Sequence, residues 1–247
     1  MRTKPDVDSN SITVTVDAPE ATASSLVEVK VKDGDKVVAT GKSVNNRPVT
    51  ITMPADVKLW SPETPAIYDM EVTLYDAGRR QVDRVESYTA MRKITTAPDE
   101  NGVMRLCLND KPLFQFGPLD QGWWPDGLYT APSYEAMIYD VDKTKDWGFN
   151  MIRKHIKVEP QLWYEYCDRN GVLVWQDMPS GDTDPEWQQF NYFNGTEKQR
   201  SAESEANYRK EWKEIMDALY NHPSIVTWVP FNERWGQFKC PEIVEWT

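Results

Sequence analysis

Hydrophobic and polar residues alternate with a period of two along most of the first 95 residues. Each such run predicts a strand with one buried face. The clearest runs cover residues 11–16, 26–31, 49–53 and 68–75. Turn signals separate them at Asp33-Gly34-Asp35 and Asp76-Ala77-Gly78. Short strands and closely spaced turns predict an immunoglobulin-like β-sandwich over residues 1–96. Reactive side chains do not gather in this part, which we interpret as a support or docking module.

The pattern changes after a linker-like cluster at residues 97–102. Helical stripes now alternate with predicted strands at residues 113–117, 150–156, 172–177 and 225–231. Ser133 is the expected N-cap of the first helix, Pro160 opens the second, and the third carries the stripe Tyr208, Trp212, Ile215 and Leu219. The run 225–231 is continuously apolar and is expected to be buried on both faces. Alternation of strands and helices predicts parallel strands joined by right-handed crossovers.

Two parallel designs fit this alternation, an open doubly wound sheet and a closed barrel. A glycine-rich phosphate loop follows none of the strands, which disfavours the open nucleotide-binding sheet. Polar residues instead follow every predicted strand: Asp120, His155, Gln176-Asp177 and Asn232-Glu233. Four strands that deliver polar groups to one rim favour a TIM barrel. Because a complete barrel takes about 250 residues, residues 97–247 are expected to be its incomplete N-terminal half.

Composition excludes several classes of function. The formal net charge of −11 leaves no basic surface for nucleic acid. No apolar run is long enough to span a membrane. Three scattered cysteines predict neither a disulfide framework nor a zinc site. We therefore expect no cofactor, no metal, no nucleic-acid partner and no membrane partner. The first residues lack a signal-peptide core, which leaves the cellular location undetermined.

Several ordered motifs resemble glycoside hydrolase family 2, which contains β-galactosidases, β-glucuronidases and β-mannosidases. The motifs are LWSPETP at 59–65, GFNMIRKH at 148–155, WYEYCD at 163–168, VWQDMP at 174–179 and HPSIVTWVPFNE at 222–233. The first is similar to the end of that family's immunoglobulin-like middle domain. The others are similar to the second, third and fourth strands of its catalytic barrel, with the helix after the second.

The resemblance implies a retaining β-glycosidase with a carbohydrate substrate. Glu233 would be the general acid that protonates the glycosidic oxygen and then the base that activates water, a role that requires a raised pKa. Asn232 would bind the sugar's 2-hydroxyl. Arg153, His155 and Asp177 would line the pocket floor, although a buried polar network that braces the barrel mouth is an equally good reading for Arg153 and Asp177.

The remaining candidate substrate-binding residues are Asp120, at the end of the first strand, and three tryptophans. Trp123, Trp124 and Trp235 could stack on sugar rings, with core packing as the competing interpretation. The aromatic residues of the loop 181–200, Trp187, Phe190, Tyr192 and Phe193, could form a wall of the same site.

The nucleophile of the family is a glutamate on a later strand, which residues 1–247 do not contain. Glu242 and Glu245 follow Glu233 too closely, in a helical pattern, to replace it. We therefore expect the chain alone to be inactive and to lack the rest of its own barrel as a partner. Open strand edges would favour self-association, including a homo-oligomer.

Two alternatives differ from a retaining glycosidase. One is a noncatalytic carbohydrate-binding or scaffold protein that has kept the rim aromatics. The other is an inverting hydrolase that uses Asp177 and Glu233, which would need carboxyl groups about 6.5–9.5 Å apart.

Overall fold

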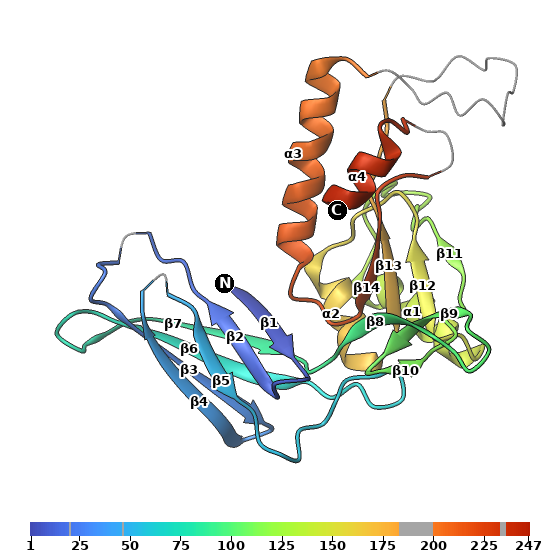
Figure 1. Ribbon diagram of the computed structural model, residues 1–247. Helices are drawn as coiled ribbons and strands as arrows, with labels where there is room; N and C mark the ends of the chain where they lie inside the picture. Colours follow the sequence, from blue (N-terminus) through green and yellow to red (C-terminus); the bar gives the residue numbers. More distant parts are fainter. Residues whose placement is uncertain (20, 46, 183–199, 233–235) are drawn as a thin grey trace, which may run out of the picture. The chain divides into compact units, whose positions relative to one another are not determined.

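The structure, a computed structural model, describes residues 1–19, 21–45, 47–182, 200–232 and 236–247. Within it the chain forms two compact units (Figure 1). The first consists of Met1–Phe114, Asp168–Gly171 and Asn221–Pro223, and the second of Gln115–Cys167, Val172–Tyr220 and Ser224–Thr247. The boundary after residue 96 that the sequence suggests stays a prediction.

The first unit is built from antiparallel sheets. Its strands are β1 (Arg2–Asp6), β2 (Ser11–Thr15), β3 (Leu26–Asp33), β4 (Lys36–Val44), β5 (Val49–Thr52), β6 (Tyr68–Tyr75), β7 (Gln81–Thr89), β8 (Ile94–Pro98), β9 (Met104–Leu108) and β10 (Lys111–Pro112). They pair in the orders β1-β2-β5, β4-β3-β6-β7 and β10-β9-β8. The inward-facing residues of the first two sheets share one core that contains Ile12, Val29, Ile51 and Met70. The predicted β-sandwich is therefore confirmed.

The second unit is built around a parallel sheet. Its strands β11 (Leu119–Asp120), β12 (Met151–Lys154), β13 (Leu173–Asp177) and β14 (Ile225–Val229) pair in that order. The helices are α1 (Tyr134–Asp146), α2 (Gln161–Asn170), α3 (Ala202–Leu219) and α4 (Cys240–Trp246). The four consecutive parallel strands confirm the predicted partial α/β barrel, and parallel pairing brings the carboxyl ends of the strands to one rim.

The helices begin and end where the sequence indicates. The Ser133 hydroxyl caps α1 by accepting a hydrogen bond from the backbone N–H of Ala136 at 3.1 Å. Gly171 follows α2 with φ +69°, a left-handed conformation that glycine adopts at little cost. Buried side chains of α1 and α2, including Val141, Trp163 and Cys167, pack in one core with Ile152 of β12.

The predicted first strand of the barrel, residues 113–117, is wrong. The strand is instead β11, and the side chain of Phe114 is 81% exposed. Carbonyl groups of Phe116 and Pro118 do accept bonds from the β12 side, at 3.0 Å each from the N–H groups of Asn150 and Arg153. Pro118 has no N–H to return, so the regular ladder starts only after it.

The expectation that residues 225–231 are buried on both faces is also wrong. In β14 only Ile225 is buried, and the other residues are half-buried. Among the described strands, β14 pairs with β13 alone, so one of its edges lacks the cover that a central strand has.

Candidate active site

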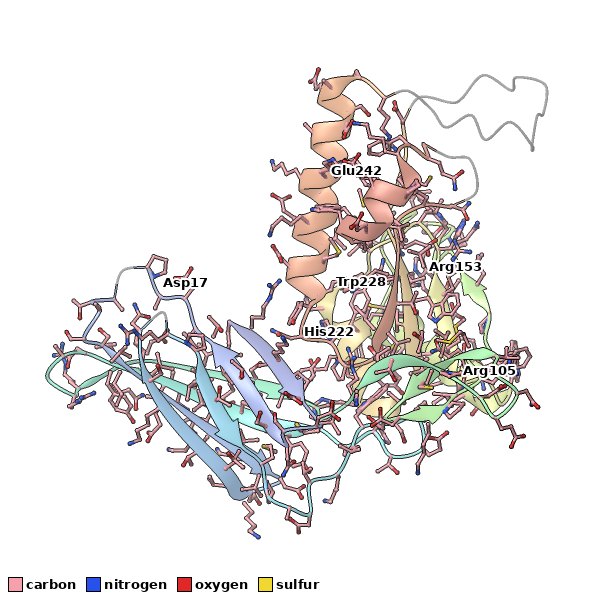
Figure 2. The ribbon with its side chains drawn as sticks, viewed as in Figure 1. Asp17, Arg105, Arg153, His222, Trp228 and Glu242 are labelled. Atoms are coloured by element: carbon pink, nitrogen blue, oxygen red, sulfur yellow. The ribbon has the colours of Figure 1, made fainter. Side chains whose placement is uncertain are left out.

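A polar group links the carboxyl ends of β12, β13 and β14. The Arg153 guanidinium (Figure 2) donates to both oxygens of Asp177, from Nε to Oδ1 at 3.0 Å and from Nη2 to Oδ2 at 2.9 Å. Nη2 also donates to Oδ1 of Asn232 at 3.1 Å. The Asp177 side chain is fully buried and also accepts the N–H of Ile156 at 3.3 Å. The bidentate pair of Arg153 and Asp177 fixes the ends of β12 and β13 relative to each other, and the bond to Asn232 adds the segment after β14.

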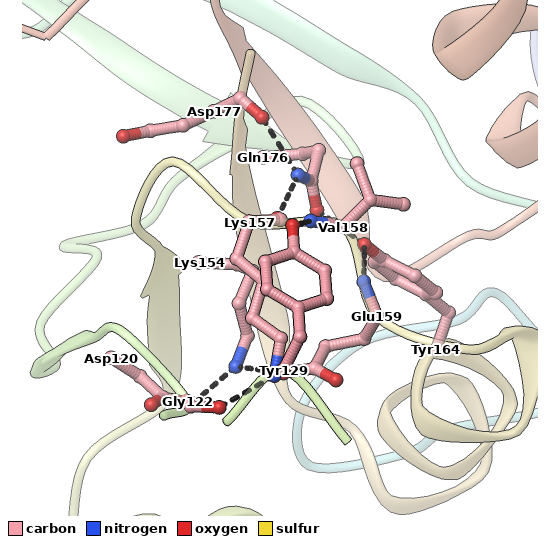
Figure 3. Close-up of polar contacts among 10 residues, drawn as sticks. All are labelled: Asp120, Gly122, Tyr129, Lys154, Lys157, Val158, Glu159, Tyr164, Gln176 and Asp177. Atoms are coloured by element: carbon pink, nitrogen blue, oxygen red, sulfur yellow. Dashed lines mark hydrogen bonds and ion pairs between the residues drawn. The ribbon is translucent and has the colours of Figure 1, made fainter. Parts of the chain in front are cut away.

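Next to this group lies a cluster of buried charges (Figure 3). Lys154 and Lys157 are each only 1% exposed, and both ammonium groups lie 2.9 Å from Oε1 of Glu159. Lys154 also contacts Oδ2 of Asp120, and Lys157 donates to the carbonyl of Gly122, both at 2.5 Å. Two lysines thus face two carboxylates. Such pairing is what makes burial of the four charges tolerable.

Aromatic rings and an amide complete the surroundings of the lysines. Nζ of Lys154 lies 4.5 Å from the ring centroid of Trp163, and Nζ of Lys157 lies 4.9 Å from that of Tyr129. These distances are within the range of cation–π attraction. The buried hydroxyl of Tyr164 donates to Oε1 of Gln176 at 2.6 Å and accepts the N–H of Glu159 at 3.1 Å. Burial raises the pKa of Tyr164 well above its usual value, so the phenol stays a donor.

His155 follows β12 and is buried. Its Nδ1 lies 3.4 Å from Nε2 of Gln121, on the loop after β11. His155 therefore adjoins that loop.

A pocket of about 690 Å³ lies between this loop and the start of α1. Its lining residues are Asp120, Gln121, Gly122, Trp123, Trp124, Glu135, Ala136, Tyr139 and Asp140. The volume is within the range of about 300–1,000 Å³ that is common for small-molecule sites. Acidic and aromatic side chains dominate the wall.

The two carboxyl groups that α1 contributes to the pocket differ in pKa. Partial desolvation, followed by the charge of Asp120, raises the pKa of Asp140. Hydrogen bonds, first from its own backbone N–H and then from Ser133, lower the pKa of Glu135 at the helix N-terminus.

The structure brings most of the predicted site residues into this region. Arg153, Asp177 and Asn232 contact one another, His155 adjoins Gln121, and Asp120 binds Lys154. Trp123 and Trp124 line the pocket. Glu233, Trp235 and the loop residues Trp187, Phe190, Tyr192 and Phe193 lie outside the described residues. The roles of all these residues stay predictions.

Sequence reasoning missed the buried lysines and the contribution of α1. Lys154 is the last residue of β12 and Lys157 lies three residues after it, and a charge at or next to a buried strand is a usable signal of a buried pair. Tyr139 and Asp140 carry no such signal, because they have the composition of an exposed helix face.

Among the described residues, no group of histidine, cysteine or acidic side chains has the arrangement of a metal site. Within the same residues, no helix is long and apolar enough to cross a membrane.

Known proteins with similar sequences are larger than this chain. It is 28% identical to a β-galactosidase of Lactococcus lactis over 180 residues, which is 71% of this chain and 16% of that protein. It is 27% identical to a β-galactosidase of Leuconostoc mesenteroides over 212 residues, which is 85% of this chain and 19% of that protein. The chain thus spans less than a fifth of the length of either relative.

A solved structure of a larger protein is also similar to this chain in sequence and fold. The β-glucuronidase of Bacteroides uniformis is 28% identical, with a TM-score of 0.67 over 90% of this chain and 26% of that one.

Models of one family match nearly the whole chain. The model described as glycosyl hydrolases family 2 matches residues 1–92, and the model of that family's TIM barrel domain matches residues 106–247. The second match alone covers more than half of the sequence. The chain therefore belongs to glycosyl hydrolases family 2.

Proposed function

We propose that the protein that carries this chain hydrolyses O-glycosidic bonds of β-glycosides by a retaining mechanism, with Glu233 as the general acid and base. The observation that carries the proposal is the linked group of Arg153, Asp177 and Asn232 at one rim of the parallel sheet. Catalytic residues of barrel enzymes occupy this rim. Glu233 directly follows Asn232 in the sequence.

In this proposal Asn232 binds the 2-hydroxyl of the sugar, a contact that strengthens as charge develops at the anomeric carbon. The Asn232 side chain is buried, and Arg153 donates to its Oδ1. That bond occupies the amide oxygen and orients the NH₂ group, which is then the group that can donate to the sugar hydroxyl oxygen.

The environment of Asp177 supports the retaining proposal over the inverting one. Both carboxylate oxygens accept bonds from Arg153, and the side chain is fully buried. A general base must reach the attacking water. Asp177 therefore fits a structural role, bracing the mouth of the barrel, better than the role of a general base. The second carboxylate of a retaining mechanism lies about 5–5.5 Å from the first, and we assign it to no residue of this chain.

Hydrolysis of aryl β-glycosides by the full-length protein that carries this chain tests the proposal, with β-galactosides first because the two curated relatives above are named β-galactosidases. Glu233→Gln is expected to lower kcat by about 10²–10⁴-fold, the usual contribution of general acid–base catalysis. Glu245→Gln, an exposed position on α4, is the control and should change nothing. Equal activity of wild type and Glu233→Gln would refute the assignment.

The stereochemistry of the first product is a second, independent readout. Proton NMR should detect the β-anomer before mutarotation if the mechanism retains configuration. The α-anomer would identify an inverting enzyme. Sugar binding without turnover would favour the noncatalytic carbohydrate-binding alternative.

We further propose that residues 1–247, expressed alone, do not hydrolyse glycosides. The described residues form four parallel strands, whereas the barrel that supports this chemistry has eight. Turnover of an aryl glycoside by the isolated chain that is lost in Glu233→Gln would contradict this proposal.

A further inference from the structure

The pocket beside α1 is separate from the group at the strand ends. Neither Arg153, Asp177 nor Asn232 lines it. We propose that this pocket binds a second, uncharged sugar ring, next to the sugar whose bond is broken, and that it disfavours uronic acids. The inference rests on the proposed function and deepens it, because it names the substrate class as β-linked oligosaccharides with a neutral sugar at this place.

Exposed aromatic rings in the pocket suit a pyranose. The side chains of Trp123 and Tyr139 are 57% and 56% exposed, although both are large and aromatic. Trp123 is held edge-on against Tyr129, with ring centroids 5.3 Å apart and an interplanar angle of 79°. The negative face of an aromatic ring attracts the C–H groups of an apolar partner, and a pyranose presents such groups on its flat face.

The charges of the wall select against anions. Glu135 and Asp140 line the pocket together with Asp120, whose charge is paired with Lys154, and the described lining residues include no lysine or arginine. Carboxylates only accept hydrogen bonds, and charge-assisted bonds from hydroxyl groups are strong. A neutral sugar offers such hydroxyl donors, whereas the carboxylate of a uronic acid would face like charges.

Buried lysines hold one wall of the pocket in place. Lys157 donates to the carbonyl of Gly122 in the loop, and Lys154 pairs with Asp120 at the end of β11, so the chain is fixed on both sides of Gln121. Both lysines share Glu159. A wall that is ordered before binding loses less conformational entropy when the sugar arrives.

Contacts place the pocket beside the strand-end group. Gln121 lines the pocket and lies 3.4 Å from His155. Asp120 lines the pocket and binds Lys154, the residue after Arg153. The contact between Gln121 and His155 thus connects the pocket to the end of β12, whereas Arg153 and Lys154, as successive residues of that strand, point to opposite faces of the sheet.

The test uses the full-length protein that carries this chain and two β-linked disaccharides. Both have the same non-reducing sugar, but the leaving sugar is a neutral hexose in one and a uronic acid in the other. We expect kcat/KM of the wild type to be at least about tenfold higher for the neutral one. Removing two carboxylates in the double variant Glu135→Gln/Asp140→Asn should narrow that preference by about fivefold to tenfold, the scale of charge interactions near a protein surface.

Tyr139→Ala removes an aromatic stacking surface and should raise KM for the neutral disaccharide by about tenfold. Trp147→Ala is the matched control. Trp147 is also an exposed aromatic residue of α1, at its C-cap, and does not line the pocket. Circular dichroism checks that each variant is folded.

The outcomes separate the inference from the proposed function. If aryl glycosides are hydrolysed but the pocket substitutions leave the disaccharide KM and the neutral-to-acidic ratio unchanged, the inference is overturned and the function stands. A preference for the uronic acid also overturns it. If nothing is hydrolysed, calorimetric titration of the neutral disaccharide decides. Binding that Tyr139→Ala abolishes supports the pocket alone, and no binding to the wild type overturns it.

Discussion

Two buried lysines at and just after the end of β12, Lys154 and Lys157, organise the candidate site. A lysine that is 1% exposed must be paired, because an isolated buried ammonium group costs several kcal/mol. The partners come from the next turn of chain, Glu159, and from a loop more than thirty residues earlier, Asp120 and Gly122. The sequence marks the lysines as unusual but does not identify these partners.

Gly122→Ala tests how tightly the loop is held. Gly122 has φ +65°, and a Cβ at this position would lie 2.6 Å from Oε1 of Glu159 and 3.0 Å from Nζ of Lys154. The left-handed conformation alone costs a non-glycine residue about 1–2 kcal/mol. We expect the free energy of unfolding to fall by about 2 kcal/mol or more, measured by urea denaturation.

Gly181→Ala is the control for this substitution. A Cβ there meets nothing within 4 Å, and the backbone is not left-handed. The change should therefore stay within about 0.5 kcal/mol of the wild type. A Gly122→Ala protein as stable as the control would show that the loop can shift at little cost in free energy, and would contradict the argument that it is held tightly.

At the scale of elements, the period of the hydrophobic pattern predicts the positions of strands better than it predicts how many of their faces are buried. The alternating runs of β2, β3, β5 and β6 each bury one face, as expected. The run before Pro118 is apolar yet forms no strand, because proline interrupts the ladder. The burial of a strand also depends on the strands and helices beside it. The apolar β14 is therefore mostly half-buried, since among the described strands it pairs with β13 alone.

Charge pairs across the sheet β4-β3-β6-β7 provide a prediction at this scale. Glu71 on β6 lies 2.9 Å from Lys30 and 3.2 Å from Lys32 on β3, and 2.9 Å from Arg84 on β7. Hydrogen bonds from the two lysines, first Lys30 and then Lys32, lower the pKa of Glu71 to about 2.

A lowered carboxyl pKa has a defined sign in stability. Above pH 4.5, the value taken for an unfolded glutamate, the contribution of Glu71 is fully present. As the pH falls toward about 2 the unfolded chain binds the proton first, so the contribution is lost. Glu71→Gln should therefore lower the melting temperature at pH 7, and the difference from wild type should shrink steadily between pH 4.5 and 2.

Scanning calorimetry across this pH range measures the effect. Glu100→Gln, an exposed turn residue, is the control and should follow the wild type at every pH. A difference between wild type and Glu71→Gln that stays constant with pH would contradict the charge argument.

At the scale of the whole molecule, the first compact unit is not continuous in sequence. It includes Asp168–Gly171 and Asn221–Pro223 as well as the N-terminal 114 residues. Asp168 connects these segments. Its carbonyl accepts Nε1–H of the fully buried Trp60 at 2.7 Å, and its Oδ2 accepts the hydroxyl of Tyr88 at 2.7 Å and lies 2.6 Å from Nδ1 of His222.

Asp168→Ala is expected to destabilise this unit by about 2–6 kcal/mol, because the hydroxyl of Tyr88 and the ring of His222 both lose a fully buried partner, at about 1–3 kcal/mol for each. Asp168→Asn keeps one acceptor oxygen and should cost less. Urea denaturation gives the magnitudes. Asp35→Ala, in the exposed turn between β3 and β4, should be neutral. An Asp168→Ala protein of wild-type stability would exclude the connecting role.

Residue types, hydrophobic period and turn and cap signals were sufficient for the β-sandwich, for three of the four parallel strands and for the polar residues at their ends. These features depend on neighbours along the chain, through backbone geometry and the burial of one face, so the sequence alone determines them. Only the tertiary structure decided which charged side chains pair with one another. It also decided that Glu135, Tyr139 and Asp140 of α1 form a pocket wall with the loop after β11. The contacts of Asp168 with three distant segments were likewise visible only in the tertiary structure. Such partners meet through folding of segments far apart in the chain, and no local pattern encodes the distance between them.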